Sequence, residues 1–434
     1  MNPRFRDRVP LCAAIAIGLA GSTGHPLGIV AAAGMPFVCL MQATRQAAFQ
    51  STFSYYVAGL WPLVPGLERY VGQPATLLIP LTLWIFTAIL LSVPWTIAWT
   101  SNPLHFLWRV PLALLATIVP PLGIIGLGSP MIAAGYLFPG TAWTGLAAAA
   151  LLPGILLSTP AFSSRRRCLI HWIAIGFCIG LAIGGRVLPS GDAAATPGWI
   201  AVNTHFGDLS HPFGDYVAAQ FIQQEAAKTS ARVVIFPESV VPRWSKATEA
   251  FWRESLDRCR ASGQILAIGA GLPAKDRIKS DDREKLSDLR SYDFGAAINA
   301  LNNVNRQSSP ALIKPDPEPI DNTLLIVGAE SATFYQRVPV PVGMWQPFSR
   351  ISVPLRLGAP GVLTVDHQRA AVLICYEQLL TFPILASMLQ HPTVIVGISN
   401  TFWVNGTTIP TYQATALRSW AKLFRLPYFS AVNS

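Results

Sequence analysis

Two residues in the second half of the chain have types and positions suited to proton transfer and acyl chemistry. Glu238 directly follows the apolar run Val233–Pro237, and Cys375 directly follows the apolar run Ala371–Ile374. Short apolar runs of this kind predict buried strands, so a carboxylate and a thiol each stand at a strand end. Burial raises the pKa of a carboxylate toward that of a general base, and the amino end of a following helix favours a thiolate. A carboxylate near such a thiol can take its proton.

Each residue also has a structural interpretation. Taken alone, Glu238 is more often a surface residue in a loop than a catalytic group, and a single cysteine is more often a buried core residue than a nucleophile. Cys259 and Cys375 are the two cysteines of the second half, and an oxidising compartment would allow them to pair. The sequence has no CxxC pair and no clustered His and Cys residues, so we expect no metal and no cofactor.

The elements that position these residues alternate between strand-like and helix-like stretches, which predicts an α/β layered domain. Helices are expected at Tyr216–Ser230, Ala247–Ala261, Glu377–Gln390 and Thr411–Arg425. Strands are expected at Trp199–Thr204, Arg232–Phe236, Ile265–Gly269, Phe294–Leu301, Thr323–Val327, Ala370–Cys375 and Thr393–Ile398.

The first half has a different composition. Hydrophobic residues make up 51% of the chain and charged residues 12%, whereas soluble domains carry about 25% charged residues. Residues 1–187 hold 10 Arg, no Lys and two acidic residues, Asp7 and Glu68. A wholly soluble enzyme is excluded, and a transmembrane bundle of about seven helices is expected over 1–187. The expected spans are Leu11–Ala20, Leu27–Met41, Ser51–Val64, Thr76–Trp99, Pro103–Leu127, Met131–Leu157 and Cys168–Gly185.

Basic residues at the ends of these spans predict the orientation. Arginines precede the first span and the last span (Arg4, Arg6, Arg8, Arg165, Arg166, Arg167), and such residues stay on the cytoplasmic side. The domain 188–434 is then extracytoplasmic, in the periplasm, on a multi-pass protein of the bacterial inner membrane. A cleaved signal peptide is an alternative interpretation of the first span. A transporter would need charged residues inside spans, and only Arg109 is well placed for that.

Three motifs of the second half resemble the nitrilase superfamily. They are Phe236–Ser239 (FPES), Tyr335–Arg337 before a Pro-rich stretch, and Ile374–Glu377 (ICYE). Within that superfamily the likeness is greatest to the apolipoprotein N-acyltransferase branch, which joins a multi-span bundle to an exported carbon-nitrogen hydrolase domain. The resemblance implies an α-β-β-α sandwich for 188–434 and a Glu–Lys–Cys triad.

Carried over residue by residue, the resemblance makes Glu238 the general base and Cys375 the nucleophile, with Glu377 as a supporting carboxylate and Tyr376 between them. It implies that the thiolate takes an acyl group from a phospholipid and forms a thioester. A protein amine then accepts the acyl group. The implied partners are membrane lipid, a phospholipid acyl donor and an amine acceptor.

Three departures distinguish the chain from that branch. Arg337 is assigned to the position of the catalytic Lys, and Met344 replaces a carboxylate. The chain also ends at Ser434, where the branch continues through more sheet and a last span. These departures predict a specialised paralogue of the kind encoded among plasmid transfer genes. Its partners would be other conjugal transfer proteins, with no direct binding of nucleic acid. Two functions stay open: a Cys-dependent acyltransferase or amidase, and a non-catalytic scaffold of an envelope-spanning DNA-transfer apparatus.

Overall fold

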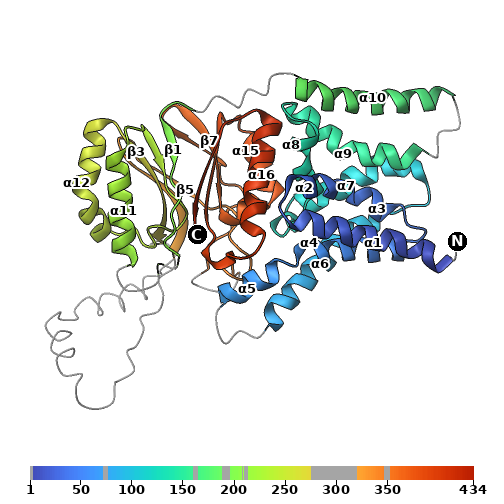
Figure 1. Cartoon of the computed structure of the whole chain (residues 1–434), viewed down its shortest axis with the longest axis horizontal. Coiled ribbons are helices and arrows are strands. Elements are labelled where there is room, and N and C mark those ends of the chain that lie inside the picture. Colours follow the sequence, from blue (N-terminus) through green and yellow to red (C-terminus); the bar gives the residue numbers. More distant parts are fainter. Residues whose placement is uncertain are drawn as a thin grey trace, which may run out of the picture.

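The computed structural model describes residues 3–71, 77–159, 165–187, 196–207, 209, 214–274, 320–346 and 352–434. Its N-terminal part consists of helices and its C-terminal part is a layered α/β unit, and the two lie side by side (Figure 1). The strand predicted at Phe294–Leu301 lies outside the described residues.

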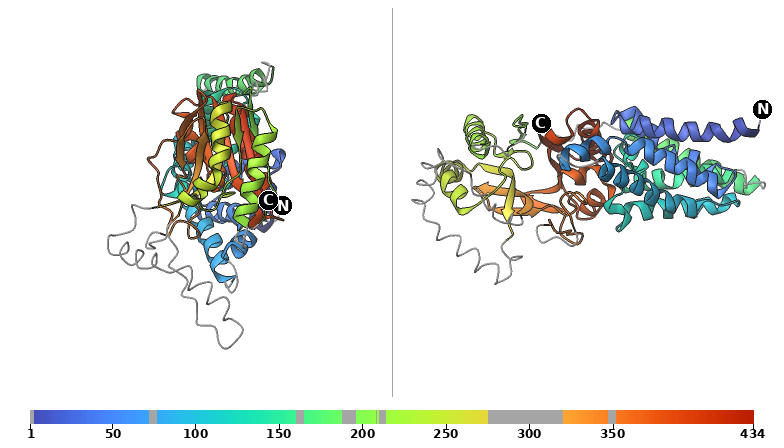
Figure 2. Two further views of the ribbon diagram at one scale, coloured as in Figure 1. Left: turned by 90° about the vertical axis from the view of Figure 1, so that its left-hand side faces the viewer. Right: turned by 90° about the horizontal axis from the view of Figure 1, so that it is seen from below.

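The N-terminal part is a bundle of apolar helices. Figure 2 shows its long helices running roughly parallel and away from the α/β part. The helices are α1 (Pro3–Ser22), α2 (Pro26–Ala32), α3 (Met35–Leu40), α4 (Arg45–Leu60), α5 (Leu63–Val71), α6 (Leu78–Ala98), α7 (Phe106–Ile118), α8 (Ala134–Leu137), α9 (Ala142–Ser158) and α10 (Arg165–Val187), with 3₁₀ turns η1 (Pro103–His105), η2 (Leu122–Ile124) and η3 (Pro130–Ala133).

Four of the predicted spans are not single helices. The stretch Pro103–Leu127 contains η1 and α7, which ends at Ile118 because Val119 is extended, and then η2. The stretch Ser51–Val64 is divided at Trp61 and Pro62 between α4 and α5. The stretch Leu27–Met41 is divided between the short helices α2 and α3, because the chain turns at Ala33 and Gly34. The stretch Met131–Leu157 begins with η3 and α8, and its long helix α9 starts only at Ala142. Among the described residues, only α6 is both long and apolar enough to cross a bilayer; Val9–Ser22, Pro26–Leu40, Pro103–Ile118, Ala142–Ser158 and Trp172–Arg186 are apolar but shorter.

The C-terminal part contains two sheets packed face to face. The first has the order β1-β2-β3-β4-β5, with β1 to β3 parallel and β4 and β5 antiparallel. The second has the order β6-β7-β8-β9, with β6 antiparallel to β7 and the others parallel. The strands are β1 (Trp199–Ala201), β2 (Val233–Ile235), β3 (Ile265–Pro273), β4 (Ile320–Gly328), β5 (Ala332–Tyr335), β6 (Val362–Val365), β7 (Gln368–Ile374), β8 (Val394–Asn400) and β9 (Tyr428–Asn433).

Helices cover both outer faces of this sandwich, as Figure 1 shows. The helices α11 (Gly214–Lys228) and α12 (Lys246–Ser262) cover the first sheet, and α15 (Thr381–Met388) and α16 (Ile409–Phe424) cover the second. Side chains alternate between the faces of each strand: Val233 and Ile235 pack between the sheets, whereas Val234 packs toward α11 and α12. The α-β-β-α layering is therefore the one expected.

The sandwich sits on the helical bundle through a buried apolar core. Residues of α16 and α15, such as Trp420 and Ile384, belong to the same core cluster as Trp95 and Val110 of the bundle. Hydrogen bonds cross the same junction: the Tyr136 hydroxyl donates to the Thr415 carbonyl at 3.3 Å. The second sheet and the bundle are thus packed directly against each other.

The stretch after Cys375 also differs from its prediction. A single helix was expected over Glu377–Gln390, but a 3₁₀ turn, η6 (Cys375–Leu379), comes first and α15 follows from Thr381. The reason is local, because Leu380 is extended at φ −105° and ψ 145° and separates the two. The thiol therefore stands at the start of a tight turn rather than at the amino end of a long helix.

Candidate active site between the two sheets

Glu238 comes from the first sheet. The chain leaves β2 through Phe236 and Pro237, and the Glu238 side chain is buried, with 5% exposed. Its carboxylate accepts hydrogen bonds from Nδ2 of Asn322 at 2.6 Å and from the backbone N–H of Asn400 at 2.8 Å. Burial raises the pKa of Glu238, and hydrogen bonds from Cys375, Asn322 and Asn400 oppose that shift.

Cys375 comes from the second sheet, directly after β7. Its thiol is hydrogen bonded to the Glu238 carboxylate and faces the backbone N–H groups of Asn400 and Tyr376. Its backbone has φ +49°, a left-handed conformation that is costly for a residue other than glycine. Strain of this kind persists where the surroundings impose it, and it is concentrated at functional sites. The two residues singled out from the sequence therefore meet between the sheets.

The electrostatic surroundings keep the Cys375 thiol protonated. Burial raises the pKa of Cys375 well above its ordinary value, and the negative charge of Glu238 raises it further. The two backbone N–H groups act in the opposite direction and do not reverse the shift. Glu238 is thus positioned to accept the thiol proton, but no cation among its contacts stabilises the resulting thiolate in the part of the chain that the structure describes.

An amide pair lies next to Glu238. Asn322, on β4, donates from Nδ2 to the carboxylate and also to Oε1 of Gln336 at 3.1 Å. Gln336 follows β5 and donates from Nε2 to the Ile374 carbonyl, directly before Cys375, at 3.2 Å. Gln336 is fully buried. The neutral side chains of Asn322 and Gln336 therefore connect the base to the strand end that carries the thiol.

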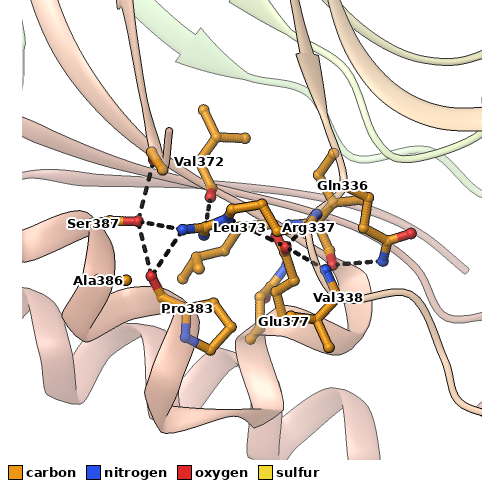
Figure 3. Close-up of polar contacts among 12 residues, drawn as sticks. Gln336, Arg337, Val338, Val372, Leu373, Glu377, Pro383, Ala386 and Ser387 are labelled. Carbon is orange, nitrogen blue, oxygen red and sulfur yellow. Dashed lines mark hydrogen bonds and ion pairs between the residues drawn. The ribbon is translucent and has the colours of Figure 1, made fainter. Parts of the chain in front are cut away.

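Arg337 follows Gln336 in the sequence, but its guanidinium forms hydrogen bonds with α15 and β7. Nη1 donates to the Pro383 carbonyl at 3.1 Å and to the Ser387 hydroxyl at 3.0 Å, and Nη2 donates to the Val372 carbonyl at 3.2 Å. Figure 3 shows the guanidinium directed toward Pro383 and Ser387 on α15. Arg337 thus joins α15 to β7, and its described contacts do not include Glu238 or the Cys375 sulfur.

Glu377 organises the backbone around the thiol. One carboxylate oxygen accepts from the N–H groups of Arg337 at 2.7 Å and Val338 at 3.1 Å, and the other accepts from the N–H of Ile374 at 2.9 Å. Its neighbour Tyr376 donates from its hydroxyl to the Ile124 carbonyl at 2.9 Å, which ties the turn to the helical bundle. Glu377 is fully buried, so it acts on the site through the backbone.

Met344 and Cys259 are the remaining candidates from the sequence. Met344 packs against the apolar core that joins bundle and sandwich. Cys259 is a buried free thiol on α12, and Cys375 is also free, so the pairing that an oxidising compartment would allow is not formed. The described residues hold no group of three or more His, Cys, Asp or Glu side chains that could bind a metal.

The sequence analysis missed Asn322 and Gln336. Gln336 stands inside the Tyr335–Arg337 motif, one position before the residue assigned to the lysine. Strand alternation gives no signal there, because Gln336 and Arg337 are both fully buried. One feature of the sequence could have pointed to Asn322: it is a polar residue directly before the apolar run Thr323–Val327.

The sequence motifs predicted a nitrilase-like sandwich on a helical bundle. The structure has a helical part, a sandwich with helices on both outer faces, and a buried pair formed by Glu238 and Cys375. No family model matches the sequence. Among solved structures, a mutant of the Nesterenkonia AN1 amidase from the nitrilase superfamily matches 54% of this chain and 74% of its own, at 12% identity and a TM-score of 0.31. Another mutant of that amidase, with acrylamide added at its active-site cysteine, matches at 13% identity, 54% and 77% coverage and a TM-score of 0.29.

The sequence is similar over nearly its whole length to the conjugal transfer protein TraB. It is 27% identical over 445 residues to the probable conjugal transfer protein TraB of Sinorhizobium fredii, covering 99% of both chains. It is also 27% identical over 459 residues to TraB of Agrobacterium fabrum, covering 99% of this chain and 94% of that one. The similarity to a plasmid transfer protein that the sequence motifs predicted is therefore confirmed.

Proposed function

We propose that this chain is a membrane-bound conjugal transfer protein that forms an acyl thioester on Cys375. The observation that carries the proposal is the buried contact between the Cys375 thiol and the Glu238 carboxylate. It is supported by the strained backbone of Cys375 at φ +49°.

The proposed chemistry uses the groups already in contact. Glu238 takes the proton of the Cys375 thiol, and the sulfur attacks the carbonyl carbon of a phospholipid acyl ester. The negative charge then formed on the carbonyl oxygen is placed against the backbone N–H of Tyr376. The ester bond breaks, the leaving alkoxide takes the proton from Glu238, and the acyl group stays on sulfur until a protein amine accepts it.

The helical part supports the membrane setting. Residues 69–191 contain no Asp or Glu, and the bundle exposes many large apolar side chains, including Ile97, Trp172, Phe177 and Ile183. Apolar surface on this scale calls for a lipid environment. We propose that 1–187 is a multi-pass bundle in the inner membrane and that 188–434 is a periplasmic domain, so that the site works next to its lipid donor.

A second candidate function is a non-catalytic scaffold in the plasmid transfer apparatus. It is favoured by the neutral amide pair of Asn322 and Gln336, which takes the place beside Glu238 where a cation would stabilise the thiolate. Without that cation the pKa of Cys375 stays well above its ordinary value. On this alternative, Cys375→Ala would leave the frequency of plasmid transfer unchanged.

A thioester trap separates the two functions. The full chain, purified in detergent, is incubated with a phospholipid that carries an alkyne-tagged acyl chain, and labelled peptides are located by mass spectrometry. We expect a label on Cys375 that hydroxylamine removes and that is absent from Cys375→Ala. Cys259→Ala is the matched control, because it removes the other buried thiol of the sandwich and leaves the Cys375 contacts intact. Absence of any label on Cys375, together with normal transfer by Cys375→Ala, would favour the scaffold.

A further inference from the structure

Three cations form a row on one face of α16 and its end. Arg418, Lys422 and Arg425 are spaced by four and three residues, which places them on the same side of a helix. All three side chains are exposed. A fourth exposed cation, Arg186, comes from the last turn of α10.

These four cations converge around Tyr136 on α8. Arg186 donates from Nη2 to the Tyr136 carbonyl at 3.1 Å, and Nζ of Lys422 lies 4.9 Å from the Tyr136 ring centroid. The Arg425 side chain lies against Gly140, shortly after α8. Figure 1 shows α8 against α16, near the end of α10. We name Arg186, Arg418, Lys422 and Arg425 the Tyr136 basic patch.

The patch has no acidic counterpart in the surrounding sequence. Neither 69–191 nor 378–434 contains an Asp or a Glu, and these two segments supply all of the elements that form the patch. Within the part of the chain that the structure describes, no ion pair involves any of the four cations. Arg418 instead donates to the Tyr428 hydroxyl at 3.2 Å. The positive charge is therefore not neutralised by the protein.

The patch begins where the apolar surface of the bundle ends. On α10 the exposed apolar residues Trp172, Phe177 and Ile183 precede Arg186. On α9 the exposed Trp143 stands in the first turn and packs edge-on against Phe424 of α16, with ring centroids 5.3 Å apart. A tryptophan and a basic residue at neighbouring helix ends are typical of a membrane–water interface.

We propose that the Tyr136 basic patch binds the anionic headgroups of phospholipids, such as phosphatidylglycerol, in the leaflet next to the sandwich. This inference rests on the proposed membrane insertion of 1–187. In that orientation the patch lies on the non-cytoplasmic side, where an excess of Lys and Arg is disfavoured. Four cations there therefore need a local interaction that stabilises their positive charge. Attraction to anionic lipid supplies one and fixes the height of the sandwich above the bilayer.

The test compares lipid binding to two variants that lose equal charge. The triple variant Arg418→Gln, Lys422→Gln and Arg425→Gln removes the row on α16. The matched control Lys246→Gln, Arg253→Gln and Arg258→Gln removes three exposed cations from α12, on the opposite face of the sandwich. Native mass spectrometry of the full chain in detergent, titrated with short-chain phosphatidylglycerol or phosphatidylcholine, reports the affinity for each lipid.

We expect the native chain and the control to bind phosphatidylglycerol more tightly than phosphatidylcholine, and the triple variant to lose at least about tenfold of that preference. Equal binding of the two lipids by the native chain would overturn the inference, as would an unchanged preference in the triple variant. Displacement of phosphatidylglycerol by an equal concentration of inorganic phosphate would also overturn it, by showing a site for free phosphate.

Failure of the membrane proposal itself has a separate readout. Cells expressing the chain are fractionated, and the membranes are washed with alkaline carbonate. A chain released by the wash would overturn both the multi-pass proposal and the lipid site. A chain that stays in the membrane but shows no lipid preference would overturn only the lipid site.

Discussion

The guanidinium of Arg337 is paired with the carboxylate of Glu377, with Nε of Arg337 3.4 Å from Oε1 of Glu377. Both side chains are buried. This contact gives the positive charge a structural role. Arg337 is surrounded by carbonyl and hydroxyl oxygens of β7 and α15. Within the described residues, the carboxylate of Glu238 at the candidate active site is contacted by amide, thiol and backbone N–H groups.

Arg337→Lys is expected to destabilise the sandwich without activating the site. An ammonium group cannot replace the separate hydrogen bonds from Nη1 and Nη2, and unpaired carbonyls would remain buried. The expected loss in the free energy of unfolding is about 2–4 kcal/mol. It would be measured by thermal unfolding of the full chain in detergent. An unchanged melting temperature would contradict the structural role of this arginine.

A substitution at Gly361 tests the packing around the Arg337 guanidinium. A Cβ at Gly361 would collide with the Ser387 hydroxyl and with Nη1 of Arg337. We expect Gly361→Ala to destabilise the chain by about 1–3 kcal/mol. Gly358→Ala is the matched control, because nothing lies near the added methyl group there. If Gly361→Ala and Gly358→Ala had equal stability, the packing around Arg337 would be different from the one described.

The pH dependence of alkylation reports the charge next to the thiol. The carboxylate of Glu238 raises the pKa of Cys375, so the thiolate forms only at high pH. Replacing Glu238 by neutral Gln removes that part of the shift and leaves the part due to burial. The rate of iodoacetamide reaction at Cys375 should therefore rise at a lower pH in Glu238→Gln than in the native chain.

Peptide mass spectrometry distinguishes this reaction from alkylation of Cys259. The opposite result, a rise at higher pH in Glu238→Gln, would contradict the statement that the charge of Glu238 raises the pKa of Cys375.

The sequence was sufficient to predict that Glu238 and Cys375 each follow a buried strand. Glu238 and Cys375 each end a continuous apolar run, and buried strands of that kind are readable from composition alone. The strands β5, β6 and β9 were not predicted; all three lie at a sheet edge, and β5 and β6 have four residues each. Their pairing depends on neighbouring strands more than on their own residues.

The sequence could not show which partners the adjacent residues Gln336 and Arg337 contact. Gln336 and Arg337 follow β5 in succession, and both are buried on the second sheet's side of the site. The motif match assigned Arg337 to the lysine position, whereas in the structure Gln336 is hydrogen bonded to Asn322 and Arg337 is hydrogen bonded to Ser387. Long-range partners of this kind lie far away in the sequence, so no local pattern encodes them.

Gln336→Lys is expected to increase thioester formation. A lysine at that position would bring a cation next to Glu238, on the strand end that carries Cys375, and would stabilise the negative charge that develops during acylation. The expected gain is roughly 10²-fold, comparable to one charge-stabilising donor. Gln336→Met, of similar size and without charge, is the control and should give no gain.

The most direct test of the account is the rate at which a tagged acyl chain appears on Cys375 of the native chain, of Gln336→Lys and of Glu238→Gln. The account predicts slow, hydroxylamine-sensitive labelling of the native chain, faster labelling of Gln336→Lys and none of Glu238→Gln. Labelling of Cys375 that is unaffected by Glu238→Gln, or no labelling of any of the three, would contradict the claim that Glu238 and Cys375 act together as base and nucleophile.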